Sequence, residues 1–371
     1  MEFLEIQKEA DKIVAEKWTA GISVQMGSLD RSYYISSGYM DELSDTRINP
    51  HTLYDLASVS KLYVLVAIMK LQEQKVIDIE KKISDYTPLF SNIGDLRLFE
   101  LMNFTDGLTT SSRIDLCSNY DEALQVLYNI RKTNTQTQYS DMGIIVITQI
   151  IDSILGGPSS FKKYITKLWE QAGLTETFWW TDLPQSKSAD TLCYDKEYRI
   201  LNGQFYTSHA FVGQVHDKKA QILGFSGHAG VFSTASDIAL FSEKLLHQEI
   251  LNDATIALIT SDKYNSFTQT QTYGLMCYKK NPDKKFSEIP ENSSPKSIAM
   301  SGYTGVYLFL DFENKNYVFI GSNRINNRLT ENDNSLPISS TKNPWLKYVK
   351  DYVYRKDILR DLCIEFLDPL N

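Results

Sequence analysis

Residues 53–71 read LYDLASVSKLYVLVAIMKL, and this stretch decides how the chain is interpreted. Ser58 and Lys61 stand three positions apart at the start of a segment that is apolar almost all round. Such a segment predicts a buried helix. Residues three apart on a helix share a face, so we expect the lysine amine beside the serine hydroxyl. A serine with a neighbouring base can act as a nucleophile without histidine.

Taken alone, a serine at this position is more simply a helix cap. Two further boxes change that interpretation. Tyr139-Ser140-Asp141 precedes the apolar run MGIIVITQII at 142–151, and Met300-Ser301-Gly302 precedes the run VYLFL at 306–310. The second run is rich in β-branched and aromatic residues and predicts a strand.

The order of these boxes resembles the Ser-x-x-Lys, Tyr-x-Asn and Lys/His-Thr/Ser-Gly pattern of the penicillin-recognising serine hydrolases. The branch that it resembles holds class C β-lactamases, D-alanyl-D-alanine peptidases and related esterases. The likeness extends from about residue 53 to residue 324. Beyond the boxes it is carried by LMNFTDGL at 101–108, GQVHD at 213–217, GHAGVFSTA at 227–235, YTG at 303–305 with Asp311 and Glu313, and Asn323-Arg324.

The pattern of elements predicts an α+β fold. Strands are expected at 20–26, 33–37, 273–278, 303–312 and 316–322, and helices at 2–17, 161–171, 236–246 and 345–366. Strands near both ends, with helical patterns between them, suggest one sheet built from both termini. The resemblance implies a single catalytic domain over 1–371, with an antiparallel sheet flanked by helices. Its α/β lobe would span about 1–74 and 226–371, and an inserted, mainly helical lobe about 75–225, with the active site between them.

The resemblance also implies the roles of the site residues. Ser58 would be the nucleophile, and either Lys61 or Tyr139 the base that takes its proton. A carboxylate at Asp141 would keep Lys61 charged and so favour the phenolate of Tyr139 as the base. The oxyanion hole would consist of the backbone N–H groups of Ser58 and Tyr303.

Asp141, Met300, Ser301 and Gly302 are expected to contact the substrate, and two of them depart from the family pattern. Asp141 stands where asparagine is usual, and Met300 where lysine or histidine is usual. Methionine offers no hydrogen or positive charge to a substrate carboxylate. Gly302 would allow close approach of a substrate backbone because it has no Cβ.

The implied function is a serine hydrolase that forms an acyl-enzyme on a small ester, or on a D-alanyl ester or amide. A β-lactamase or a D-Ala-D-Ala carboxypeptidase is the second interpretation. A penicillin-binding-fold protein that binds ligand with little turnover is the third, and Met300 and Asp141 favour it. A Ser-His-Asp triad using His216, Asp217 or His228 is less simple than hydrogen bonds that fix loops, and no G-x-S-x-G elbow is present.

Composition argues against nucleic acid and membrane as partners, and the expected partner is a small-molecule substrate. The 371 residues are 42% hydrophobic and carry a net charge of −8, which argues against nucleic acid or anionic membrane as a partner. No signal peptide or membrane-spanning segment is expected, so the chain as given is expected to be cytoplasmic, or extracellular if a leader was removed. The four cysteines (Cys117, Cys193, Cys277, Cys363) are widely spaced and are expected to be free. No metal or cofactor is expected, and the sequence does not give the oligomeric state.

Overall fold

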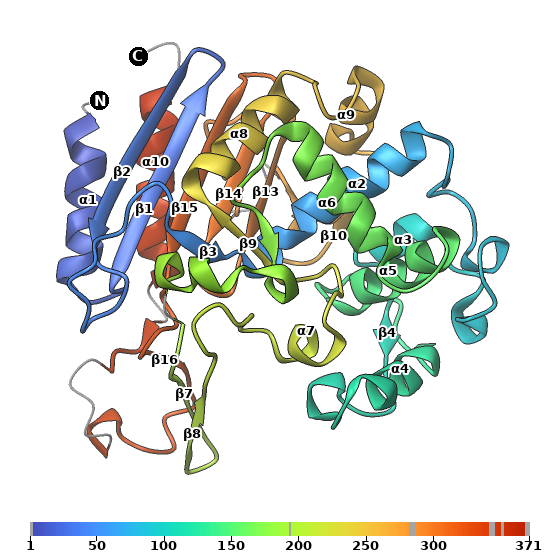
Figure 1. The fold of residues 1–371 in the computed structure, drawn as a ribbon, viewed down its shortest axis with the longest axis horizontal. Coiled ribbons are helices and arrows are strands. Elements are labelled where there is room, and N and C mark those ends of the chain that lie inside the picture. Colours follow the sequence, from blue (N-terminus) through green and yellow to red (C-terminus); the bar gives the residue numbers. More distant parts are fainter. Residues whose placement is uncertain (1–2, 193, 282–286, 341–345, 350–351, 368–371) are drawn as a thin grey trace.

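A computed structural model describes residues 3–192, 194–281, 287–340, 346–349 and 352–367. Its main element is an antiparallel sheet of eight strands in the order β10-β11-β12-β13-β14-β15-β1-β2 (Figure 1). In that order the strands are Ser266–Phe267, Thr272–Tyr273, Tyr278–Lys279, Ser297–Ser301, Tyr307–Asp311, Asn316–Ser322, Gly21–Ser28 and Arg31–Gly38. Both ends of the chain therefore contribute to one sheet.

Helices cover both faces of this sheet because its central strands bury side chains on each side. In β15, Val318 and Ile320 join the core beneath α1 (Phe3–Ala15) and α10 (Tyr352–Leu367), whereas Phe319 joins the larger core on the opposite face. Helix α8 (Ala235–Leu246) packs against β1 and β15 on that opposite face, across the sheet from α1 and α10 (Figure 1). The alternation of strand side chains fixes this layering.

The other helices gather beside one end of the sheet (Figure 1). The nearly all-apolar segment predicted to be buried is α2 (Ser60–Glu73). The remaining helices are α3 (Leu98–Met102), α4 (Tyr120–Tyr128), α5 (Met142–Ile154), α6 (Ser160–Ala172), α7 (Lys218–Leu223) and α9 (Asp253–Thr260). Short 3-10 helices lie at Ala57–Val59, Ile83–Asp85, Ser91–Ile93, Ile114–Leu116, Trp180–Asp182, Gln185–Asp190 and Ile338–Ser340.

Three small sheets connect these parts. They consist of β3 (Leu53–Asp55), β9 (Val231–Thr234) and β6 (Phe178–Trp179); of β16 (Leu329–Asn332), β7 (Glu197–Leu201) and β8 (Gln204–Ser208); and of β4 (Leu108–Thr109) and β5 (Arg131–Lys132). The β7–β8 hairpin falls inside the 75–225 range expected to be mainly helical, yet it pairs with β16 from the C-terminal part. The division into two lobes stays a prediction.

The α+β class and the antiparallel sheet are confirmed, and some element boundaries were wrong. The strand expected at 273–278 is a tight hairpin, because Met276 has a positive φ of 54° and the chain reverses between β11 and β12. The strand expected from 303 begins at Tyr307, after a turn in which Gly305 has φ 107°. The start of the last expected helix, residue 345, lies outside the described residues, and α10 begins at Tyr352.

The sequence also predicts free cysteines and no membrane-spanning segment. Cys117, Cys277 and Cys363 are free and buried, and Cys193 lies outside the described residues. Among the helices of the described ranges, none combines the length and apolar character that a membrane crossing requires.

Candidate active site

A strained turn presents Ser58. Strand β3 ends at the buried Asp55, and the 3-10 helix Ala57–Val59 follows it. Ala57 adopts φ 44°, which is unfavourable for a residue with a side chain. The Asp55 carboxylate holds this turn, since one oxygen accepts from the Ala57 N–H at 2.9 Å and the other from the His216 N–H at 2.8 Å. Ser58 is left partly exposed at the turn.

Lys61 lies beneath Ser58 and is fully buried in the first turn of α2. Its Nζ lies 2.9 Å from Ser58 Oγ, 3.0 Å from the His228 carbonyl oxygen and 2.8 Å from Asp141 Oδ1. An ammonium group has three hydrogens and no lone pair. Lys61 therefore donates to Ser58 and to the His228 carbonyl and forms an ion pair with Asp141.

Tyr139 completes the contacts of the Ser58 hydroxyl, with its Oη 2.8 Å from Ser58 Oγ. Its ring is fixed by Phe104, whose ring centroid is 4.9 Å away, and by the parallel ring of Tyr278 at 6.4 Å. The Lys61 Nζ lies 5.2 Å from the centroid of the same ring. Ser58, Lys61 and Tyr139, which are distant in sequence, thus meet around one hydroxyl.

Asp141 determines the charge of this cluster. Burial lowers the pKa of Lys61, but the Asp141 carboxylate and Tyr139 outweigh burial and raise the pKa above its ordinary value. Burial likewise raises the pKa of Asp141, but Lys61, followed by His228 and Lys219, holds it well below its usual range. Lys61 and Asp141 therefore form a charged pair at neutral pH.

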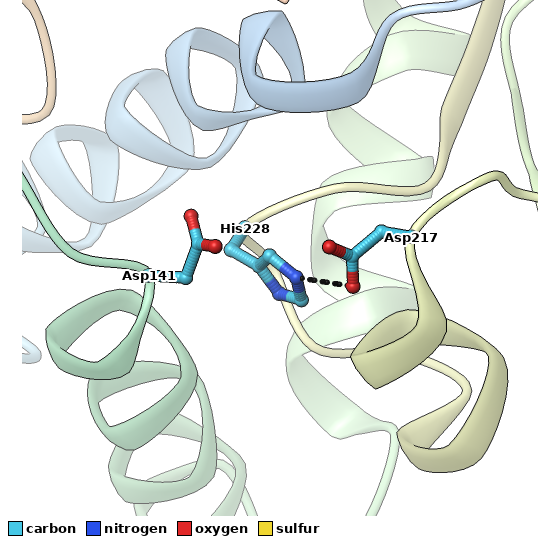
Figure 2. A group of neighbouring side chains, drawn as sticks. All are labelled: Asp141, Asp217 and His228. Atoms are coloured by element: carbon cyan, nitrogen blue, oxygen red, sulfur yellow. Dashed lines mark hydrogen bonds and ion pairs between the residues drawn. The ribbon is translucent and has the colours of Figure 1, made fainter. Parts of the chain in front are cut away.

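A second set of charges lies behind Asp141. The His228 imidazole lies between Asp141 and Asp217, and its Nε2 is 2.9 Å from Asp217 Oδ1 (Figure 2). The Lys219 Nζ lies 3.0 Å from Asp141 Oδ2 and 3.4 Å from Asp217 Oδ2. Asp141, Asp217 and His228 are the residue types of a metal site. They do not fit a cation here, because the Lys219 ammonium already bridges the two carboxylates.

The third box lies at the end of β13. Ser301, Gly302 and Tyr303 line the cavity above Ser58, whereas Met300 is fully buried and is not among the lining residues. Met300 pairs with Leu308 of β14 and packs in the larger core. We therefore do not carry forward the substrate contact expected for Met300.

Gly302 is needed for a reason other than the one expected. A Cβ at this position would lie 2.4 Å from Val306 Cγ2, 2.7 Å from the Leu56 carbonyl oxygen and 3.2 Å from the Ala57 Cβ. These atoms belong to the protein, and two of them belong to the turn that carries Ser58. The absence of a side chain lets the end of β13 approach that turn.

A lysine from a distant helix lies beside this box, which the sequence analysis missed. The Lys356 Nζ, from α10, is 3.1 Å from Ser301 Oγ and 3.1 Å from Glu288 Oε2, and Lys356 lines the cavity. Ser301 Oγ in turn donates to Glu288 Oε2 at 2.5 Å. No sequence motif marks Lys356, because its place depends on how α10 packs against the sheet.

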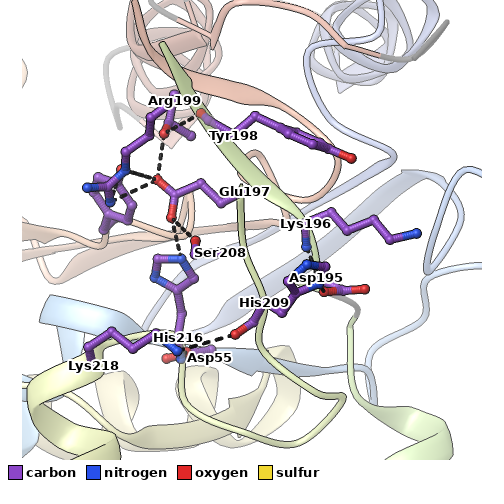
Figure 3. Close-up of polar contacts among 12 residues, drawn as sticks. Asp55, Asp195, Lys196, Glu197, Tyr198, Arg199, Ser208, His209, His216 and Lys218 are labelled. Atoms are coloured by element: carbon purple, nitrogen blue, oxygen red, sulfur yellow. Dashed lines mark hydrogen bonds and ion pairs between the residues drawn. The ribbon is translucent and has the colours of Figure 1, made fainter. Parts of the chain in front are cut away.

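Glu197 organises another wall of the cavity (Figure 3). Its buried carboxylate accepts from Tyr303 Oη at 2.6 Å and lies 2.7 Å from His216 Nε2. Burial raises the pKa of Glu197, but the hydrogen bond and charge of His216 outweigh it and lower the pKa. The rings of His216 and Tyr303 stack at 5.5 Å. These contacts hold the loop that follows Gly302.

His216 and His228 make hydrogen bonds that fix loops, as the sequence predicts. His216 Nε2 contacts Glu197 and His228 Nε2 contacts Asp217, while the hydrogen-bond partners of Ser58 Oγ are Lys61 and Tyr139. A Ser-His-Asp triad is therefore not formed around Ser58.

A cavity of about 760 Å³ is lined by residues of all three boxes, Ser58, Tyr139, Asp141, Ser301 and Gly302. Ser58, Tyr139 and Asp141 lie on one side of it, and Ser301 and Tyr303 on another. A volume of several hundred Å³ accommodates a small-molecule substrate. The arrangement places the Ser58 hydroxyl, the Tyr139 phenol and the end of β13 around one accessible space, with the Lys61 amine buried beneath Ser58.

Comparisons with known proteins agree with the fold. A "Putative D-alanyl-D-alanine carboxypeptidase" of Escherichia coli (strain K12) is 25% identical over 307 residues, which cover 74% of this chain and 69% of that protein. The solved structure of EstCE1, "a hydrolase with promiscuous acyltransferase activity", has a TM-score of 0.69 at 18% identity and covers 86% of this chain and 93% of its own. A penicillin binding protein from Bacillus halodurans has a TM-score of 0.63 at 18% identity, covering 87% and 95%.

A family match covers most of the chain. The sequence model of the family described as Beta-lactamase matches residues 6–336, a range that includes all three boxes and every strand of the main sheet. This chain belongs to the Beta-lactamase family.

Proposed function

We propose that the protein is a serine hydrolase that acts through an acyl-enzyme on a small ester, or on a D-alanyl ester or amide. One observation carries the proposal: Ser58 Oγ lies 2.9 Å from Lys61 Nζ and 2.8 Å from Tyr139 Oη at the wall of an open cavity. A hydroxyl held between a cation and a phenol can lose its proton as it attacks a carbonyl.

Tyr139 is the base in this proposal. A charged Lys61 donates to Ser58 Oγ and to the His228 carbonyl, and it has no lone pair with which to take a proton. Tyr139 Oη donates to Ser58 Oγ in the structure, so to act as the base it must first give up that hydrogen and then accept the one that Ser58 carries. In deacylation the same oxygen would activate water for attack on the ester of Ser58.

The oxyanion would be bound by the backbone N–H groups of Ser58 and Tyr303. Both residues line the cavity, and the approach of Gly302 to the Ser58 turn brings their backbones together. Glu197 supports this arrangement by holding the side chain of Tyr303. Loss of one oxyanion-hole donor typically costs about 2.7–4 kcal/mol of transition-state stabilisation.

The proposed substrate class rests on the size of the cavity and on the relatives named above. An ester needs less activation than an amide, and the cavity volume of about 760 Å³ suits a small molecule. The relatives named as a carboxypeptidase and as a hydrolase with acyltransferase activity support acyl transfer from a small substrate. The cytoplasmic location expected from the sequence stays a prediction.

A D-Ala-D-Ala carboxypeptidase or β-lactamase is the second candidate, and Lys356 favours it. Both kinds of substrate carry a free carboxylate. The sequence suggested weak carboxylate recognition because Met300 offers no charge, but Lys356 brings a cation to Ser301 from α10. That cation is shared with Glu288, so a substrate carboxylate would compete with a fixed acid.

A fluorophosphonate probe tests the proposal. It should label the wild-type protein, and Ser58→Ala should abolish labelling while leaving the melting temperature nearly unchanged. Ser60→Ala is a serine control for the specificity of labelling only. It is not a control for stability, because the buried Ser60 Oγ accepts a hydrogen bond from the Val231 N–H. Folded wild-type protein that resists the probe and hydrolyses no ester would instead support a ligand-binding protein without turnover.

A substrate panel then separates the candidates. Nitrophenyl esters, nitrocefin and D-Ala-D-Ala peptides would be compared on the same preparation, alongside a fluorescent penicillin. We expect the esters to give the highest kcat/KM. Faster hydrolysis of the peptides or of nitrocefin would favour the second candidate.

A further inference from the structure

Asp141 poses a chemical problem that the structure answers. The resemblance puts asparagine at this position, and an amide offers one oxygen acceptor and one NH2 donor. A carboxylate offers acceptors only. Asp141 Oδ1 lies 2.8 Å from Lys61 Nζ, as an amide oxygen could. The donor that an amide would present to a bound substrate is missing from Asp141 itself.

Lys219 brings a donor next to the position that such an amide nitrogen would take. It belongs to the first turn of α7, and its Nζ is 3.0 Å from Asp141 Oδ2, the oxygen that faces away from Lys61. The side chain lines the cavity and is 25% exposed. Burial lowers the pKa of Lys219, but Asp141 and then Asp217 outweigh burial and raise it, so the group is a charged donor at neutral pH.

The ammonium has one hydrogen to spare. Its ion-pair partners within the described ranges are the two carboxylates of Asp141 and Asp217, so at least one of its three hydrogens has no acceptor among the described residues. Because Lys219 lines the cavity, the third hydrogen is available to a ligand there.

The charges of Lys61, Lys219, Asp141 and Asp217 sum to zero. Lys61 and Lys219 carry two positive charges, and Asp141 and Asp217 carry two negative charges. His228, which lies between the carboxylates, contacts Asp217 through Nε2 (Figure 2). Removing one lysine or one aspartate leaves an excess charge, whereas removing Lys219 and the charge of Asp141 together restores the balance.

We propose that Lys219 is a substrate-binding residue, and that Asp141 and Lys219 together replace a single asparagine, with Asp141 positioning Lys61 and Lys219 donating to the substrate. The inference rests on the proposed function and deepens it. The acyl group that this site prefers carries a hydrogen-bond acceptor, such as an amide carbonyl, close to the carbonyl that Ser58 attacks.

Two nitrophenyl esters measure this preference. The acyl group of nitrophenyl acetate has no second acceptor, whereas that of the N-acetyl-D-alanine nitrophenyl ester has an amide. The readout is the ratio of kcat/KM for the amide-bearing ester to kcat/KM for the acetate. A merely structural role of Lys219 would lower both rates and leave this ratio unchanged.

Lys219→Met should lower the ratio about tenfold or more, since it removes a charged hydrogen bond to the amide. Asp141→Asn alone should also lower activity, because it leaves Lys219 with excess positive charge. The combined Asp141→Asn, Lys219→Met protein should recover a ratio above that of Lys219→Met, because the amide now supplies the donor. Lys167→Met, an exposed lysine on α6, is the control for loss of charge.

Fluorophosphonate labelling of Ser58 separates the outcomes. If the wild type is neither labelled nor active on either ester, the proposed function is wrong and this inference falls with it. If it is labelled and active but Lys219→Met leaves the ratio unchanged, or the combined protein is no better than either single variant, the inference alone is overturned. Should Lys219→Met fail to fold, the charge-balanced combined protein compared with Asp141→Asn gives the same decision.

Discussion

The two sides of the cavity are built in different ways. On the helix side, Ser58 and Lys61 come from one stretch of chain, and Tyr139 and Asp141 come from one other. On the strand side, Ser301 is joined by Lys356 from α10, while the loop after it is held by Glu197 from β7. The first side is compact in sequence, and the second is assembled from segments far apart.

This difference separates chemistry from recognition. The groups that would move a proton lie within single hydrogen-bond distances of one hydroxyl, so their geometry tolerates little change. The groups on the strand side reach the cavity through longer chains of contacts, and each can be altered without touching Ser58. We therefore expect variants of Ser58, Lys61 and Tyr139 to abolish turnover, and variants of the side chains that surround Ser301, such as Lys356, to shift selectivity.

The largest effect should come from Tyr139→Phe. Loss of the phenol oxygen removes the proposed base, and general-base catalysis contributes about 10²–10⁴-fold. The ring would keep its packing on Phe104, so the melting temperature should change little. Ester kinetics and thermal melting measure the two quantities. Tyr273→Phe, which removes a phenol from a neighbouring ring, is the control and should lose only a small fraction of the activity.

Lys61→Arg sharpens the same prediction. An arginine keeps the positive charge but cannot act as a base at neutral pH. Residual turnover in Lys61→Arg together with none in Tyr139→Phe would agree with Tyr139 as the base. The opposite pattern, an active phenylalanine variant and an inactive arginine variant that still folds, would assign the base to Lys61.

Gly302→Ala should have the next largest effect, because it breaks the contact between the two sides. The added Cβ would meet the Leu56 carbonyl oxygen at 2.7 Å and Val306 at 2.4 Å. Overpacking of this kind costs about 1–3 kcal/mol of folding free energy. We also expect kcat to fall, because the strand end must move away from the Ser58 turn. Urea unfolding and ester kinetics check both, with Gly94→Ala, whose nearest neighbour would be 3.3 Å away, as the control.

Much of the helix side could be predicted from the sequence because its geometry is local. Ser58 and Lys61 are three positions apart on a helical path, which places both on one face. The acidic residue at 141 correctly indicated a charged Lys61, since a carboxylate beside an ammonium raises its pKa. That Tyr139 meets the pair came from the family resemblance, because no local pattern connects residues 81 positions apart.

The strand side could not be predicted in the same way. Met300 was expected to face the substrate because it occupies the first position of its box, but the pleat of β13 turns it into the core. Lys356 and Glu288 reach Ser301 only through tertiary packing. Lys219 had a weak signal, its position two residues after Asp217, but the sequence does not show that its amine reaches Asp141.

Acid should lower the folding stability that the Asp217 carboxylate contributes, and we expect this effect to be smaller than that of Gly302→Ala. The pKa of Asp217 is lowered, because His228 and Lys219 outweigh its burial. A carboxylate whose pKa is lower when folded stabilises the protein above its unfolded pKa of about 3.9, and this stabilisation is lost as pH falls further. Urea unfolding should therefore show stability falling below about pH 4. Asp217→Asn should flatten that dependence, and an unchanged slope would contradict the assignment.

The smallest effect should come from Lys356→Met, and it should be selective. Lys356 Nζ contacts Ser301 and Glu288 and lies 4.6 Å from the centroid of the Tyr307 ring, but it does not contact Ser58. If this cation recognises a substrate carboxylate, its loss should lower kcat/KM for a carboxylate-bearing substrate by about tenfold. A neutral ester should be affected much less, because Ser58, Lys61 and Tyr139 are unchanged.

The Glu288→Gln variant makes that experiment decisive. Removing the Glu288 carboxylate leaves Lys356 with Asp357, at 3.4 Å, as its other acidic partner, so the preference for a carboxylate-bearing substrate should increase. Equal losses for both substrates in Lys356→Met would show that the lysine only supports the packing of α10. Opposite shifts in the two variants would show that the strand side supplies, from a distant helix, the charge that its own first residue lacks.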